Sequence, residues 1–264
     1  MSYESWLSLI YENPAGRATL PHLVKRKFLS RLYGMYCQTG HSAKKIPQFV
    51  EDYQVDMTGC EPYDSYKNFS EFFARERAGI TFPEKQNQLG SPCEGLVSTY
   101  SDILPEKLIA AKGCHFSLTE LLGDEALAEK YRGGMMIKIR LTPADYHRIH
   151  FFDDGMVSGI RFIDGDLFSV NPMAVKKIAR LYCRNKRAVI MFSSQNFGDV
   201  VIVEVGATFV GSIIHKVTEN DRIKRGQLAG YFLPGGSLVM IFLRQGAYVL
   251  KTSTETRTRV GATL

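Results

Sequence analysis

The chain has 264 residues, of which 33 are Lys or Arg and 27 are Asp or Glu, giving a formal net charge of +6. Its hydrophobic fraction of 45% and charged fraction of 23% are ordinary for a globular protein and exclude wholesale disorder. The basic excess is concentrated at the start, since residues 1–45 contain seven Lys or Arg and two Glu. A uniformly basic nucleic-acid-binding protein would not show this distribution, so nucleic acid is not an expected partner.

Cysteine usage and hydropathy limit the class further. The five cysteines form no Cys-X-X-Cys pair and their number is odd, which argues against a disulfide scaffold or a zinc ribbon. No run of about 20 apolar residues is present, and the chain begins without the basic-then-apolar pattern of a signal peptide. We therefore expect a soluble or membrane-peripheral protein.

Residues 3–12 and 20–37 are predicted to be helical. In the second segment apolar residues recur every three or four positions, with basic residues between them. Such a helix can lie on an anionic membrane surface, or it can pack on the body with its basic side in water. The pattern alone leaves both readings open. The apolar positions are Leu20, Leu23, Val24, Phe28, Leu32 and Met35, and the basic ones are Lys25, Arg26, Lys27 and Arg31.

A further helix is predicted over residues 68–77, and from about residue 95 the pattern changes to short β-rich runs separated by Gly, Asp-Gly and Pro. Because strands do not alternate with helices, a doubly wound sheet is not expected. We predict an α+β fold, with a β-rich barrel-like or sandwich-like body and an N-terminal helical segment over residues 1–65. The predicted strands cover residues 96–100, 135–141, 156–162, 188–192, 200–205, 209–217 and 237–243.

The segment from Asp145 to His150 is dense in functional groups, with Tyr146, His147 and Arg148 between them. Two histidines three residues apart could act as acid and base or as metal ligands. On an extended strand this odd spacing places them on opposite sides, which argues against both binding one ion. No other cluster has zinc-ligand spacing, and no metal is expected.

A second candidate is the run Gly235-Gly236-Ser237 before an apolar segment. It can be a simple turn into a buried strand. Alternatively, glycine permits a strained backbone that holds the serine hydroxyl against its own preceding carbonyl. Attack on that carbonyl would give an ester that is set for elimination.

Several stretches in this order and spacing, from about residue 66 to 243, resemble the phosphatidylserine decarboxylase family. They include the segment from Asp145 to His150 and the Gly-Gly-Ser run described above. The other matching stretches are Tyr66 to Arg75, Ser91 to Gly95, Lys112 to Leu118, Gly165 to Pro172, Arg184-Asn185, Val205 to Ile213 and Gly230 to Phe232.

The resemblance implies a self-processing enzyme that converts phosphatidylserine to phosphatidylethanolamine. The chain would be cut between Gly236 and Ser237, giving a large subunit of residues 1–236 and a small subunit of residues 237–264. Ser237 would become a covalent pyruvoyl cofactor that forms a Schiff base with the substrate amine. Residues 66–264 would be the catalytic domain, and the helical residues 1–65 would associate with an anionic membrane on its cytoplasmic face. A homodimer is also implied.

The resemblance also implies roles for three further residues. His150 matches the histidine that serves self-cleavage, Glu94 matches the carboxylate that orients it, and His147 matches the histidine tied to decarboxylation.

Two positions depart from the family pattern. Glu94 stands where Asp is usual, and Leu238 stands where Thr usually follows the serine. A shift of about 1 Å in a positioned site can cost on the order of a hundredfold in rate. Two alternatives therefore stay open: a pyruvoyl decarboxylase acting on a soluble amino acid, and an uncleaved, non-catalytic homologue that binds lipid.

Overall fold

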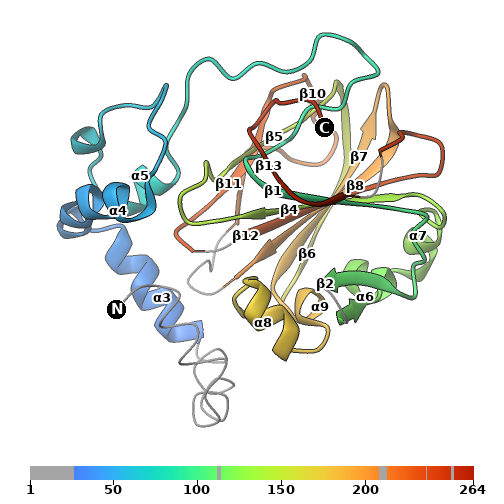
Figure 1. Cartoon of the computed structure of the whole chain (residues 1–264), viewed down its shortest axis with the longest axis horizontal. Coiled ribbons are helices and arrows are strands. Elements are labelled where there is room, and N and C mark those ends of the chain that lie inside the picture. The colour runs from blue at the N-terminus through green and yellow to red at the C-terminus, as the bar shows by residue number, and fades with distance from the viewer. Residues whose placement is uncertain (1–26, 112–113, 208–212, 236, 251–252) are drawn as a thin grey trace.

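The structure is a computed structural model that describes residues 27–111, 114–207, 213–235, 237–250 and 253–264. Its centre is an antiparallel sheet of eight strands in the order β10-β6-β7-β8-β12-β4-β1-β13 (Figure 1). The strands are β1 (Gly95–Ser101), β4 (Met135–Leu141), β6 (Gly155–Ile163), β7 (Arg187–Ser194), β8 (Gly198–Gly206), β10 (Arg222–Ile223), β12 (Ser237–Leu243) and β13 (Ser253–Thr258).

Smaller elements cover the two faces of this sheet. Four short helices lie on one face, below the sheet in Figure 1: α6 (Leu118–Leu122), α7 (Glu125–Glu129), α8 (Pro172–Lys177) and α9 (Leu181–Arg184). The strands β2 (Leu108–Ala111) and β3 (Cys114–Phe116) pair with each other on the same side. The opposite face carries a three-stranded sheet of β5 (Arg148–His150), β11 (Leu228–Phe232) and β9 (Ile213–His215).

The predicted α+β class and sandwich-like body are confirmed, and the alternative of a closed barrel is not seen. The sheet is open, with β10 and β13 as its edge strands among the described residues. A layer on each face buries the apolar side chains that an open sheet would otherwise expose.

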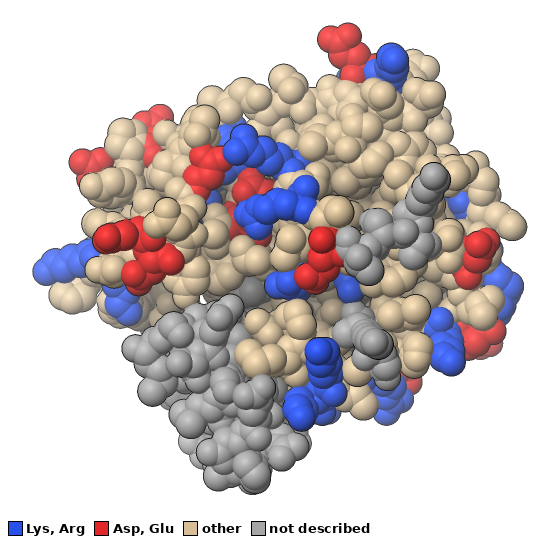
Figure 2. Space-filling view, viewed as in Figure 1, with Lys and Arg blue, Asp and Glu red and all other residues tan. Residues whose placement is uncertain are grey.

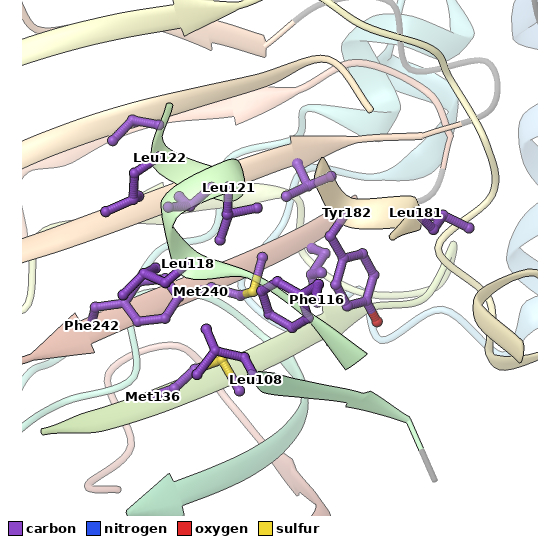
Figure 3. Close-up of a cluster of buried hydrophobic side chains, with 14 of the residues drawn as sticks. Leu108, Phe116, Leu118, Leu121, Leu122, Met136, Leu181, Tyr182, Met240 and Phe242 are labelled. Atoms are coloured by element: carbon purple, nitrogen blue, oxygen red, sulfur yellow. The ribbon is translucent and has the colours of Figure 1, made fainter. Parts of the chain in front are cut away.

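Strand β12 lies at the centre of both hydrophobic cores, and all seven of its residues are buried. Leu238, Met240 and Phe242 pack with the helices α6–α9, as Figure 3 shows for the last two. Val239, Ile241 and Leu243 pack on the opposite face. A strand covered on both faces is an uninterrupted apolar run, which explains why the sequence pattern locates it with the correct bounds.

Because of this position, substitutions that shorten a side chain of β12 should destabilise the fold. We expect Ile241→Ala to lower the free energy of unfolding by about 2–5 kcal/mol, because the buried side chain leaves a cavity between two layers. Urea unfolding measures the change. The matched control is Val249→Ala, whose side chain is 85% exposed and should change stability by less than about 0.5 kcal/mol. Equal effects of the two changes would contradict the central position of β12.

The N-terminal helices form a separate cluster on the left of Figure 1: α3 (Lys27–Cys37), α4 (Ile46–Tyr53) and α5 (Phe69–Phe73), with the 3-10 turns η1 (Gly40–Lys45) and η2 (Tyr63–Ser65). Helix α5 begins after Asn68, whose side chain accepts a hydrogen bond from the backbone N–H of Glu71. It is the helix predicted over residues 68–77. Its buried phenylalanines pack with Cys37 and Ile46, so α5 joins the helical cluster although it follows the predicted boundary at residue 65.

The predicted helix over residues 3–12 lies outside the described residues, as does the first part of the one predicted over 20–37. The described part of the latter is α3. No helix within the described ranges is long and apolar enough to cross a membrane.

Candidate active site

Ser237 is the first residue of β12 and is fully buried. It pairs with Leu141 of β4 and with Gly206 of β8. Its hydroxyl oxygen lies 3.2 Å from Nδ1 of His147, a residue 90 positions earlier in the chain. The fold thus brings together the serine of the Gly-Gly-Ser run and the first of the two predicted histidines.

The hydrogen bonds of His147 define its tautomer. Nε2 lies 3.0 Å from the carbonyl oxygen of Thr142, which can only accept a hydrogen bond, so Nε2 carries the proton. Nδ1 is then the acceptor, and the Ser237 hydroxyl donates to it. This is the arrangement of a general base beside a hydroxyl nucleophile.

The surroundings of His147 keep it neutral. The ring is fully buried and stacks on Phe73, with 4.0 Å between ring centroids. Burial, with a smaller contribution from the Arg75 guanidinium, lowers the pKa of His147 to about 3. The imidazole is therefore unprotonated across the physiological pH range and available to accept a proton.

A buried carboxylate supports this histidine indirectly. Asp145 accepts hydrogen bonds from the backbone N–H of Thr142, at 2.5 Å, and from its hydroxyl, at 2.8 Å. The same carboxylate forms an ion pair with Arg257 of β13. Because the carbonyl of Thr142 holds His147, Asp145 fixes the loop that orients the ring.

His150 has different neighbours. Its Nδ1 donates to the carbonyl oxygen of Gly226 at 2.8 Å, so Nε2 is the acceptor for the Tyr146 hydroxyl at 3.1 Å. Burial lowers the pKa of His150, and the carbonyl of Gly226 opposes that shift. No hydrogen bond between His150 and Ser237 is present among the described residues. The assignment of His150 to self-cleavage therefore stays a prediction.

Glu94 is buried and is bound by arginines. Its carboxylate accepts from Arg77 at 2.5 Å, and Arg257 lies 3.7 Å away. No hydrogen bond or ion pair joins Glu94 to His150 within the described residues, so the pairing that the resemblance implies stays a prediction. Glu94 instead shares Arg257 with Asp145, so the two carboxylates and the arginine form one cluster at the start of β1 and the end of β13.

Removing the charge of Glu94 would leave Arg77 without its carboxylate partner. We expect Glu94→Gln to lower the free energy of unfolding by about 3 kcal/mol, since both side chains are less than 10% exposed. Urea unfolding in a Ser237→Ala background keeps every chain at one length. As the control, Glu255→Gln breaks a more exposed pair with Arg140 and should cost less than about 1 kcal/mol. A similar small cost at Glu94 would show that its charge does not stabilise the fold.

The second departure from the family pattern, Leu238, has a simple physical setting. Successive strand residues point to opposite faces, so Leu238 faces away from Ser237 and packs among the side chains next to α6–α9. A hydroxyl there would be placed in an apolar cluster. The leucine completes that core.

Comparison with known proteins agrees with the chemistry of this site. Residues 67–264 match the family model described as phosphatidylserine decarboxylase.

The chain belongs to the phosphatidylserine decarboxylase family.

Full-length relatives agree. The chain is 40% identical over 261 residues to the phosphatidylserine decarboxylase proenzyme of Clostridium novyi (strain NT), covering 98% of this chain and 88% of the relative. It is 41% identical over 258 residues to the proenzyme of Ruminiclostridium cellulolyticum, covering 97% and 86%. The similarity to these decarboxylase proenzymes thus extends into the N-terminal helical part, beyond the residues matched by the family model.

In this member of the phosphatidylserine decarboxylase family, the sequence patterns assigned no role to three groups around the histidine: Phe73 beneath the ring, Arg75 beside it and Asp145 behind its loop. All three lie within stretches that carry the resemblance. Asp145 acts locally, through Thr142, whereas the contacts of Phe73 and Arg75 depend on how the helical cluster packs against the strands, which no local spacing indicates.

Proposed function

We propose that this protein converts phosphatidylserine to phosphatidylethanolamine after cutting itself between Gly236 and Ser237. One observation carries the proposal: in a chain of this family, the Ser237 hydroxyl is buried against the acceptor nitrogen of a neutral His147. A binding module that stays uncleaved has no need of a base at that hydroxyl.

Self-cleavage begins with attack of the Ser237 oxygen on the carbonyl carbon of Gly236. The peptide C–N bond breaks as the ester C–O bond forms, and the proton of the hydroxyl passes to a histidine and then to the released amine. Elimination of the Gly236 carboxylate leaves an unsaturated residue, and loss of its nitrogen as ammonia with addition of water gives the N-terminal ketone. His147 is the histidine that contacts Ser237, but the family resemblance assigns the proton transfer of this stage to His150, with Glu94 as the supporting charge. That role requires Tyr146 to release Nε2 of His150 and the imidazole to move to the Ser237 hydroxyl.

The pyruvoyl group formed from Ser237 supplies a ketone that takes the substrate amine and withdraws electrons as CO2 leaves. The surroundings of Ser237 fit such a group, because they are buried and consist of a neutral imidazole stacked on the apolar face of Phe73. Because His147 contacts the Ser237 side chain itself, it stays beside this residue after cleavage. We therefore assign to His147 the proton handling at the reacting carbon.

The small subunit, residues 237–264, would remain attached through its strands. Strand β12 pairs with β4 and β8, and β13 pairs with β1. Both subunits would be basic in total, so strand pairing and core burial, rather than opposite net charge, hold them. Arg257 adds a local contact, because it pairs with Asp145 of the large subunit.

Membrane association of the N-terminal segment on a cytoplasmic face is part of the proposal. On α3 the apolar side chains of Leu32 and Met35 are 43% and 57% exposed, so the body does not cover them. Basic and acidic side chains are interspersed over the face shown in Figure 2, without one continuous basic patch. We therefore assign membrane contact to these exposed apolar side chains of α3 rather than to the charge of that face. A homodimer is proposed on the family relationship alone.

Vesicle assays test the proposed substrate. The protein should release CO2 from phosphatidylserine in mixed vesicles and leave phosphatidylethanolamine, while free L-serine and aromatic amino acids should give less than about one hundredth of that rate. Sedimentation with anionic vesicles tests the membrane contact in the same samples. Turnover of a free amino acid without vesicle binding would favour the soluble-substrate alternative.

A further inference from the structure

A cavity of about 800 Å³ lies beside the reacting residues, between the helical cluster and the strands β9 and β11. Its wall includes Arg75, Tyr231 and Leu233. Between the last two, Phe232 donates its backbone N–H to the carbonyl oxygen of His147 at 3.0 Å. The cavity therefore adjoins the histidine that contacts Ser237, and its volume suits a small polar ligand.

Three polar side chains in this wall have buried hydrogen-bonding groups that are not fully satisfied within the described residues. Arg75 is only 1% exposed, yet its Nε and Nη1 have no hydrogen-bond partner among the described residues. Its Nη2 is held by the carbonyl oxygens of Ala144 and Asp145, at 3.0 and 3.2 Å, with the Cys60 thiol close by. The hydroxyl of Ser70, which lines the same cavity, is also buried without a partner, and the hydroxyl of Tyr66 has the backbone of Glu61 beside it but no acceptor for its own proton within the described residues. Buried donors of this kind are rare unless a ligand satisfies them.

The other arginines on the wall are already paired with carboxylates. Arg148 pairs with Glu76 at 2.9 Å and donates to the carbonyl of Ala74. Arg77 pairs with Glu94, and Glu71 accepts from the backbone N–H of Lys67. The remaining carboxylate, Glu61, is exposed. Burial lowers the pKa of Arg75 from its ordinary value, and the Glu94 carboxylate, which pairs with Arg77, only partly opposes this shift.

We propose that Arg75, with the hydroxyls of Tyr66 and Ser70, binds the phosphodiester of the substrate headgroup. This assignment rests on the function proposed above. Arginine presents paired donors that match the oxygens of a phosphodiester, and the two hydroxyls supply further donors.

The headgroup has a second anion, its carboxylate, and the chemistry argues against Arg75 as its partner. The carboxylate loses its charge as CO2 departs, so a buried cation on it would stabilise the ground state more than the transition state. The phosphodiester keeps its charge throughout the reaction. Arg75 can therefore bind it tightly at every stage without opposing the loss of CO2.

Reductive attachment of soluble amines to the cleaved protein shows whether Arg75 binds the phosphodiester or the carboxylate. With cyanoborohydride, an amine bound at the ketone becomes fixed to the small subunit, and mass spectrometry measures the yield without any decarboxylation. The probes are glycerophosphoethanolamine, which has only the phosphodiester, serine, which has only the carboxylate, and ethanolamine, which has neither. In unmodified protein, glycerophosphoethanolamine should attach at the lowest concentration.

We expect Arg75→Gln to raise the concentration of glycerophosphoethanolamine needed for half-maximal attachment by about tenfold or more, and to leave that of ethanolamine and serine unchanged. For Arg75→Lys, this concentration of glycerophosphoethanolamine should lie between those of the unmodified protein and of Arg75→Gln, since lysine keeps a charge but loses the paired donors. As the matched control, Arg148→Lys alters a partnered arginine on the same wall and should leave the ratio between the probes unchanged.

Two results would overturn the assignment. A loss for serine but not for glycerophosphoethanolamine would assign Arg75 to the carboxylate, and an equal loss for all three amines would make its role structural. If the variants are not cleaved, competition in the unmodified protein decides the question. Glycerophosphocholine, which cannot react at the ketone, should block attachment where choline does not, and equal competition by the two would contradict a phosphodiester site. An unmodified protein without any ketone would instead refute the proposed function itself.

Discussion

A chain carrying Ser237→Ala is expected to keep its full length of 264 residues and to release no CO2 from phosphatidylserine. The change removes the only atom proposed to attack the Gly236 carbonyl, and with it the source of the ketone. Intact mass and a CO2-release assay measure both consequences in one preparation. The fold should survive, since the hydroxyl makes one side-chain contact, with His147.

The matched control for this change is Ser98→Ala. Ser98 is also a buried strand serine, on β1, but it pairs with Lys138 of β4 and lies outside the site. It should be cut normally. If Ser237→Ala were still cut after Gly236, the assignment of the nucleophile would be wrong.

The second large effect is expected at His147. We expect His147→Asn to lower the rate of decarboxylation per cleaved chain by a factor on the order of 10² to 10⁴, the usual contribution of a positioned acid or base. Self-cleavage occurs once per chain, so cleaved protein should accumulate even if the change slows that step. The rate is therefore divided by the amount of small subunit, measured by mass spectrometry.

His150→Asn is the companion variant, and it should accumulate uncleaved chains. The two variants separate cleavage from decarboxylation because each histidine has its own set of contacts. The opposite pattern, with His150→Asn cut normally and His147→Asn left at full length, would transfer the cleavage step to His147. The hydrogen bond between His147 and Ser237 would then be its direct explanation.

The sequence predicts the central strands well and the edges poorly. Strands β4 and β12 were predicted with the bounds that the structure shows, because β12 is an apolar run buried on two faces and β4 alternates apolar residues with Lys138 and Arg140 along its second half. Strand β13 was missed because it is polar and lies at the sheet edge, where one side faces water. The short helices α6–α9 were missed because four to six residues carry too little periodicity to distinguish a helical turn from a loop.

The candidate site divides in the same way. Ser237 and His147 stand out in the sequence because their motifs are compact, and the structure brings them together. The residues that hold these two side chains in place come from distant segments of the chain. Arg75 reaches the loop before His147 from 70 residues away, and Arg257 reaches Asp145 across 112 residues. Such contacts depend on the packing of the helical cluster and of the edge strand β13, which no local pattern specifies.

The most direct test of the account is the intact mass of the unmodified protein after purification. The account predicts two chains, residues 1–236 and residues 237–264, with the shorter one beginning in a pyruvoyl group that reacts with hydroxylamine. A single chain of 264 residues, or a fragment that begins with an intact serine, would contradict it.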